Sequence, residues 1–104
     1  MSISMLTHRL KAKIERLFSR ELPLEVSALL EEHCGSAVPL IDAQGADGIE
    51  RIRSAALKVS DGSLVKLRLA VQLANIDWRD VLVAAGFAHS LEAHVSWLED
   101  DNHA

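Results

Sequence analysis

Cysteine occurs only once in this 104-residue sequence, at Cys34, so no disulfide can form within the chain. A single cysteine is typical of a reducing compartment. The sequence also lacks any run approaching the ~20 apolar residues that a membrane-spanning helix requires. Charged residues near the N-terminus, with no apolar stretch behind them, argue against a secretory signal. We therefore expect a cytoplasmic protein with no membrane segment.

An excess of positive charge is missing as well. Lys and Arg number 11 against 15 Asp and Glu, which gives a formal net charge of −4. Proteins bind nucleic-acid backbones through clustered Lys and Arg, so this composition argues against a nucleic-acid partner. The sequence contains no glycine-rich phosphate loop, nucleophile elbow or paired catalytic carboxylates. These absences argue against an enzyme without excluding one, and we expect no cofactor and no metal.

Apolar residues, by contrast, make up 49% of the chain. They recur at helical spacing along most of its length, and no pair of strand-like segments is present. We predict an all-α fold, a compact bundle of about six helices with short connections. Residues 1–104 would form one domain, with an N-terminal helix pair at about 2–34, a loop at 35–46 and a four-helix unit at about 47–98.

The first predicted helix carries a single apolar stripe with steps of three or four residues. The stripe consists of Ile3, Leu6, Leu10, Ile14 and Leu17. Such a stripe either packs on the core of its own chain or forms a seam with a second chain. The high apolar content leaves self-association open, because exposed apolar faces mark interaction sites.

The second half of the chain gives sharper helix signals. Asp47 and Glu50 have the spacing of a capping box, in which each side chain satisfies a backbone N–H of the other residue. The segment 63–74 has two apolar stripes, which is typical of a central helix. One stripe is Leu64, Leu67, Val71 and Ala74, and the other is Val65, Leu69, Leu73 and Ile76. Asp77 and Ser90 are expected to cap two further helices, at 78–85 and 90–98.

Residues 50–98 resemble a family of small bacterial helical proteins with no assigned activity. The resemblance rests on the segments 51–62, 64–73 and 77–87, and the most distinctive element is Asp77-Trp78-Arg79-Asp80. It implies a helical fold and a bacterial cytoplasmic setting. It implies no catalytic or ligand-binding residue.

The segments 67–74 and 78–85, with Asn75-Ile76 between them, have about the dimensions of a helix-turn-helix. A recognition helix must offer polar side chains to base edges and phosphates. The second segment offers Arg79 and Asp80 and then becomes apolar. Two ordinary packed helices therefore explain the pattern better, and DNA binding stays as an alternative.

Histidine and cysteine are the remaining residues with reactive side chains. The histidines are His8, His33, His89, His94 and His103, and no two of them stand at the i, i+4 spacing of a helical metal site. We expect solvated or capping histidines. Cys34 lies near a predicted helix C-terminus and follows two glutamates, which disfavours a reactive thiolate. We expect it to be a packing residue.

Apolar helix faces are thus the strongest functional signal in the sequence. We expect a non-enzymatic interaction or regulatory protein that binds a protein partner or a second copy of itself. Trp and Arg dominate many protein interfaces, so Trp78 and Arg79 join the first-helix stripe as candidates. The interface candidates are Leu6, Leu10, Ile14, Leu17, Trp78, Arg79 and Trp97. The alternatives are a helix-turn-helix-like DNA-binding regulator and a small-molecule-binding protein.

Overall fold

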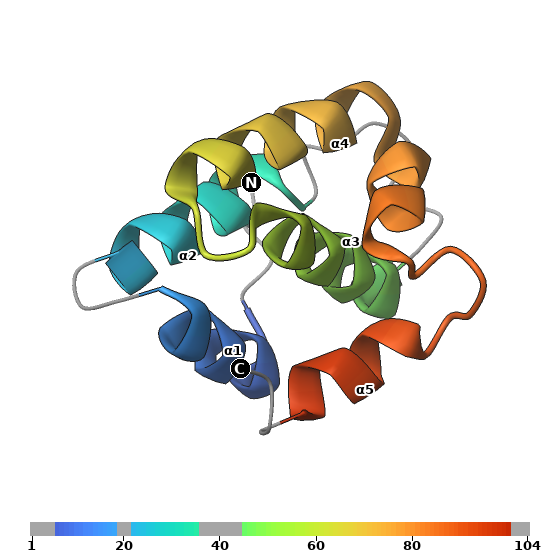
Figure 1. Ribbon diagram of the computed structural model, residues 1–104, viewed down its shortest axis with the longest axis horizontal. Helices are drawn as coiled ribbons and strands as arrows, with labels where there is room; N and C mark the ends of the chain where they lie inside the picture. Colours follow the sequence, from blue (N-terminus) through green and yellow to red (C-terminus); the bar gives the residue numbers. More distant parts are fainter. Residues whose placement is uncertain (1–5, 19–21, 36–44, 101–104) are drawn as a thin grey trace.

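A computed structural model describes residues 6–18, 22–35 and 45–100, and the side chains from residue 48 onward in the last of these ranges. The helices are α1 (His8–Leu17), α2 (Leu22–His33), α3 (Gly45–Ser60), α4 (Leu64–Ala85) and α5 (Ala93–Glu99), and the described residues contain no strand. Helix α3 lies in the middle, with α4 along one side and α1 and α5 on the other (Figure 1). The all-α prediction is confirmed.

The described residues form five helices instead of the predicted six, because the segments expected at 63–74 and 78–85 belong to one element, α4. The boundary between them survives as a kink at Asp77, where the backbone is extended (φ −154°, ψ 99°). The Asp77 carboxylate accepts a hydrogen bond from the Arg79 N–H at 3.1 Å, as an N-cap does. The sequence therefore located the break correctly, and the chain passes it without a loop.

Local side-chain chemistry explains where several helices begin and end. The hydroxyls of Thr7 and Ser63 accept hydrogen bonds from the third N–H of α1 and α4, respectively. Helix α4 ends at Gly86, whose positive φ of 79° suits glycine. The capping box predicted at residues 47–50 is wrong, because α3 already begins at Gly45. Glu50 instead makes tertiary contacts.

The core is mainly aliphatic, with Phe18 and Phe87 as its buried aromatic residues, and draws on every helix. Leu10 and Ile14 of α1 are each 1% exposed, which places the described part of the first-helix stripe inside the protein, while Ile3 lies outside the described residues. In α4 the first predicted stripe is buried or half-buried, as expected for a core-facing stripe. The second stripe is largely exposed, so the prediction of a central helix is wrong for that side. Among the described residues no helix has the length and apolarity to cross a membrane.

Side-chain cations bind the carbonyl groups at the C-termini of α2, α4 and α5. Helix C-termini carry unpaired carbonyls and a partial negative charge, so a cation there is favourable. At the end of α2, Arg53 Nε donates to the Cys34 carbonyl at 2.6 Å. At the end of α4, Lys58 Nζ donates to the Ala85 carbonyl at 2.9 Å. At the end of α5, Lys13 Nζ of α1 donates to the Trp97 carbonyl at 2.8 Å. Helices α1 and α3 thus hold the ends of their neighbours, and these hydrogen bonds offset the cost of burying Arg53 and Lys13.

Candidate functional site

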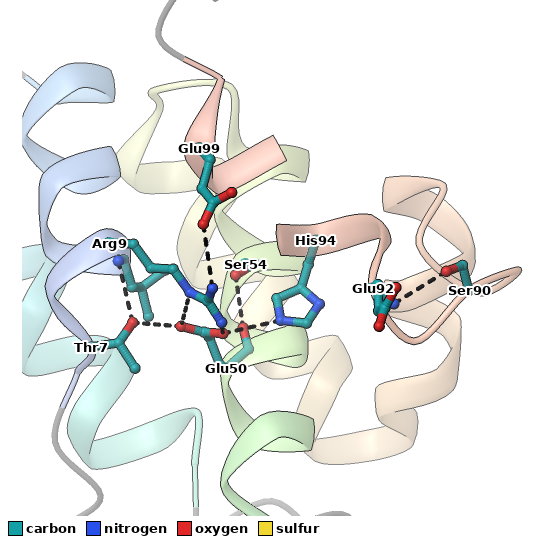
Figure 2. Close-up of polar contacts among 9 residues, drawn as sticks. Thr7, Arg9, Glu50, Ser54, Ser90, Glu92, His94 and Glu99 are labelled. Carbon is teal, nitrogen blue, oxygen red and sulfur yellow. Dashed lines mark hydrogen bonds and ion pairs between the residues drawn. The ribbon is translucent and has the colours of Figure 1, made fainter. Parts of the chain in front are cut away.

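A polar cluster around Glu50 is buried between α1, α3 and α5 (Figure 2). The Glu50 side chain is 4% exposed and accepts hydrogen bonds from three residues. Arg9 donates twice, from Nε at 2.9 Å and from Nη2 at 2.6 Å, and the Thr7 hydroxyl donates at 2.5 Å. His94 Nε2 lies 3.1 Å from the same carboxylate. The expectation of a solvated or capping His94 is therefore wrong, because its side chain is 3% exposed.

These contacts set the charge state of Glu50. Burial raises the pKa of the carboxyl group, but the hydrogen bonds from Arg9, Thr7 and His94 outweigh burial and lower the pKa to about 2. Glu50 is therefore an anion at neutral pH, held by a guanidinium group. The nearby Ser54 hydroxyl donates to the Glu50 backbone carbonyl at 2.7 Å and is fully buried. The cluster thus joins three helices, and its carboxylate and imidazole are both buried away from any substrate.

The low pKa of Glu50 predicts a loss of stability in acid. Its ordinary pKa of 4.5 applies in the unfolded chain, so the contribution is fully present above that pH and is lost as pH falls towards about 2. The shift corresponds to about 3 kcal/mol of unfolding free energy. Denaturant titrations between neutral pH and pH 2 should show this decline. In Glu50→Gln the decline should be smaller, and an equal decline in both proteins would contradict this account.

A groove between α2 and α4 is the second site. The first half of α4 runs parallel to α2, since Arg68 pairs with Glu25 at 2.7 Å and the Asn75 amide donates to the His33 carbonyl at 2.7 Å. The groove has a volume of about 600 Å³ and combines apolar and polar walls. Its lining residues are Leu29, His33, Arg68, Val71, Gln72, Asn75 and Ile76.

An aliphatic ridge borders this groove on the outer side of α4. We define the α4 ridge as Val65, Leu69, Gln72 and Ile76, which are separated by four, three and four residues. Such steps place side chains on one line of a helix. Val65, Leu69 and Ile76 are 67%, 59% and 81% exposed. Isolated surface leucines are ordinary, whereas an aligned row beside a groove is a candidate binding surface.

The interface residues predicted on the first helix lie in or against the core rather than on an exposed surface. Leu6, Leu10 and Ile14 are buried in the chain's own core, and Leu17 is half-buried against it. Of the two alternatives for the first-helix stripe, packing on the chain's own core is therefore the one observed. A partner could reach these residues only if the core opened. We therefore do not propose the stripe again as an interface.

The two tryptophans are half-buried, and neither belongs to the α4 ridge. The Trp97 and Phe87 rings pack at a tilt of 56° with centroids 6.0 Å apart, and Lys13 Nζ lies 4.5 Å from the Trp97 ring centroid. Trp78 packs against the core. Arg79 is exposed and forms an ion pair with Asp77 at 3.1 Å. Trp97 thus serves internal packing, and Arg79 stabilises the kink of α4.

The structure also bears on the hypotheses about Cys34, a helix-turn-helix and a metal site. Cys34 is fully buried, and burial raises the pKa of its thiol to about 12, so the prediction of a packing residue is confirmed.

In the helix-turn-helix hypothesis, residues 78–85 would be the recognition helix. Val81, Leu82 and Ala85 of this segment are buried in the core, which leaves Arg79 as its only exposed cation. His103 lies outside the described residues. Within the described ranges, no three His, Cys, Asp or Glu residues are placed to hold a metal.

Comparison of the chain with protein-family models, with curated proteins and with solved structures found no match in any of the three. The resemblance of residues 50–98 to a bacterial family therefore stays a prediction.

Proposed function

We propose that this protein is a non-enzymatic interaction protein that binds a helical segment along the α2–α4 face. The observation that carries the proposal is the α4 ridge, whose three aliphatic side chains are 59–81% exposed beside a groove. Grooves between helices are a common mode of peptide recognition, in which apolar anchors at helical spacing enter the groove. The polar side chains of His33, Arg68 and Asn75 would fix the position of the bound segment.

The exposure of the α4 ridge side chains to water is the physical reason to expect a partner on this face. Val65, Leu69 and Ile76 each leave more than half of the side chain in water. Fully burying one such side chain is worth about 1.5–3 kcal/mol. The Glu50 and His94 side chains, by contrast, are 4% and 3% exposed, and their cluster holds three helices together. The proposal therefore places the function on the surface and assigns the polar cluster to stability.

A small-molecule-binding protein is the second candidate, because the groove volume of about 600 Å³ falls in the range of ligand pockets. The ridge favours the helical partner, since a small ligand in the groove would leave Val65 and Leu69 exposed. A DNA-binding regulator gains no support, because the exposed side of residues 78–85 offers Arg79, Asp80 and then Val83 and Ala84. A bacterial cytoplasmic setting remains part of the proposal.

Binding of a designed peptide tests the proposal. The probe is an amphipathic helix of about 14 residues with leucines at i, i+3, i+4 and i+7, near the length at which isolated helices become stable. We expect NMR shift changes in residues that line the α2–α4 groove. Ile76→Lys should abolish them because it places a charge in the apolar contact.

Val83→Lys is the matched control. Val83 lies on the same helix beyond the kink and is 65% exposed, so the same change there should leave binding intact. Absence of binding, or equal loss of binding in both variants, would contradict the proposed function.

A further inference from the structure

We infer that the partner of the α4 ridge is a second copy of this chain, paired in parallel through the same ridge; the inference rests on the proposed function. The steps of four, three and four residues from Val65 to Ile76 are those of a coiled-coil seam. In heptad terms, Leu69 and Ile76 occupy position a, and Val65 and Gln72 occupy position d. No described element of the same chain covers this seam, since its three aliphatic side chains are mostly exposed.

Gln72 is the feature that points to a copy of the same chain. A carboxamide carries both a donor NH₂ and an acceptor oxygen, so two glutamines can satisfy each other across a two-fold axis. A parallel seam brings identical heptad positions together and therefore places Gln72 opposite Gln72 of the partner subunit. A single polar residue in such a seam fixes register and orientation at some cost in affinity.

The charges beside the ridge favour the same arrangement. The α2 side carries Glu25 and Glu32, whose side chains are 51% and 61% exposed, and one cation, Arg68, which pairs with Glu25, so the three side chains together leave a net negative charge. Lys66 lies on the opposite side of α4, because it precedes the α2-facing Arg68 by two residues, or about 200° around the helix. A two-fold axis along the helices brings the acidic side of one copy to the Lys66 side of the other. An antiparallel pair would instead set one acidic side against the other.

The size of the ridge predicts a weak dimer. From Val65 to Ile76 the helix rises roughly 17 Å, and its width is about 10 Å. Such a strip covers on the order of a few hundred Å² per copy, below the roughly 800 Å² of a standard interface. The kink at Asp77 ends the strip by turning the rest of α4 onto the core. Val83, the next position a in the sequence, therefore falls outside the contact.

Light scattering from micromolar to millimolar concentration tests the inference. We expect a monomer at the low end and a dimer at the high end. Leu69→Lys should remain monomeric throughout, whereas Val83→Lys should behave as the wild type. Gln72→Leu should strengthen the dimer, because a leucine pair replaces a buried amide pair. A monomer at every concentration would overturn the inference.

Single cysteine variants test the parallel orientation. Cys34 is buried, so it should not compete for oxidation. Leu69→Cys and Ile76→Cys should each form a disulfide-linked dimer, and Val83→Cys should not. Linking at position 69 without linking at 76 would indicate an antiparallel pair and overturn the arrangement. Equal linking at all three positions would indicate random collision and overturn it too.

The designed peptide separates this inference from the proposed function. A monomer that binds the peptide on the α2–α4 face would overturn self-pairing and leave the proposed function standing. A monomer that fails to bind the peptide would overturn both.

Discussion

Replacing Glu50 by alanine is expected to lower the free energy of unfolding by about 2–4 kcal/mol, because removing one partner of a buried ion pair leaves the other uncompensated. The carboxylate accepts four hydrogen bonds from Thr7, Arg9 and His94, which lie more than 40 residues away in sequence. The expected loss falls at the lower part of the range for fully buried pairs, since the Arg9 side chain is 38% exposed. Denaturant unfolding at neutral pH measures the change.

Glu99→Ala is the matched control for this experiment. Glu99 also contacts Arg9, at 3.6 Å, but its side chain is 63% exposed. Surface ion pairs contribute about 0–1 kcal/mol, so this variant should unfold nearly as the wild type does. If Glu50→Ala were as mild as Glu99→Ala, the polar cluster would not hold α1, α3 and α5 together.

Replacing Lys13 by methionine should cost about 2–3 kcal/mol, a typical value for hydrogen bonds to a buried charged group. Lys13 is fully buried, and its Nζ donates to the carbonyls of Trp97 at 2.8 Å and Asp100 at 3.3 Å. Methionine fills the space of the aliphatic chain but cannot donate to these carbonyls. The loss should appear in denaturant unfolding and in faster amide hydrogen exchange throughout α5.

Lys11→Met provides the control, because Lys11 lies on the exposed side of the same helix. It should change neither the unfolding free energy nor the exchange rates of α5 appreciably. A loss of stability in Lys13→Met without faster exchange in α5 would contradict the assignment of Lys13 as the cation that holds the end of α5.

The parts of the fold that the sequence predicted are those determined by local periodicity. The three- and four-residue steps through Leu10 and Ile14 predicted a helix, and these residues lie in the core. Asp77 was expected to cap a helix, and it caps the second half of α4. Such signals need only neighbouring residues, because a helix face and an N-cap are both defined within one or two turns.

The candidate sites were missed because they depend on packing between distant segments. Periodicity cannot pair Glu50 with His94, and the spacing from Asp47 to Glu50 suggested a capping box instead. Both apolar stripes of 63–74 looked equally suited to burial. Packing against α3 and α2 buried the stripe containing Leu67 and left the one containing Leu69 in water. A sequence identifies apolar faces, but tertiary packing decides which one remains available to a partner.

The NMR spectrum recorded during addition of the designed helical peptide, at a chain concentration where the protein is monomeric, tests the central claim most directly. The account predicts shift changes concentrated at the α4 ridge and at Leu29 and His33 of α2, with saturation as the peptide increases. Shift changes confined to α1, α3 and α5, or none on the α2–α4 face, would contradict the claim that this face is the binding surface.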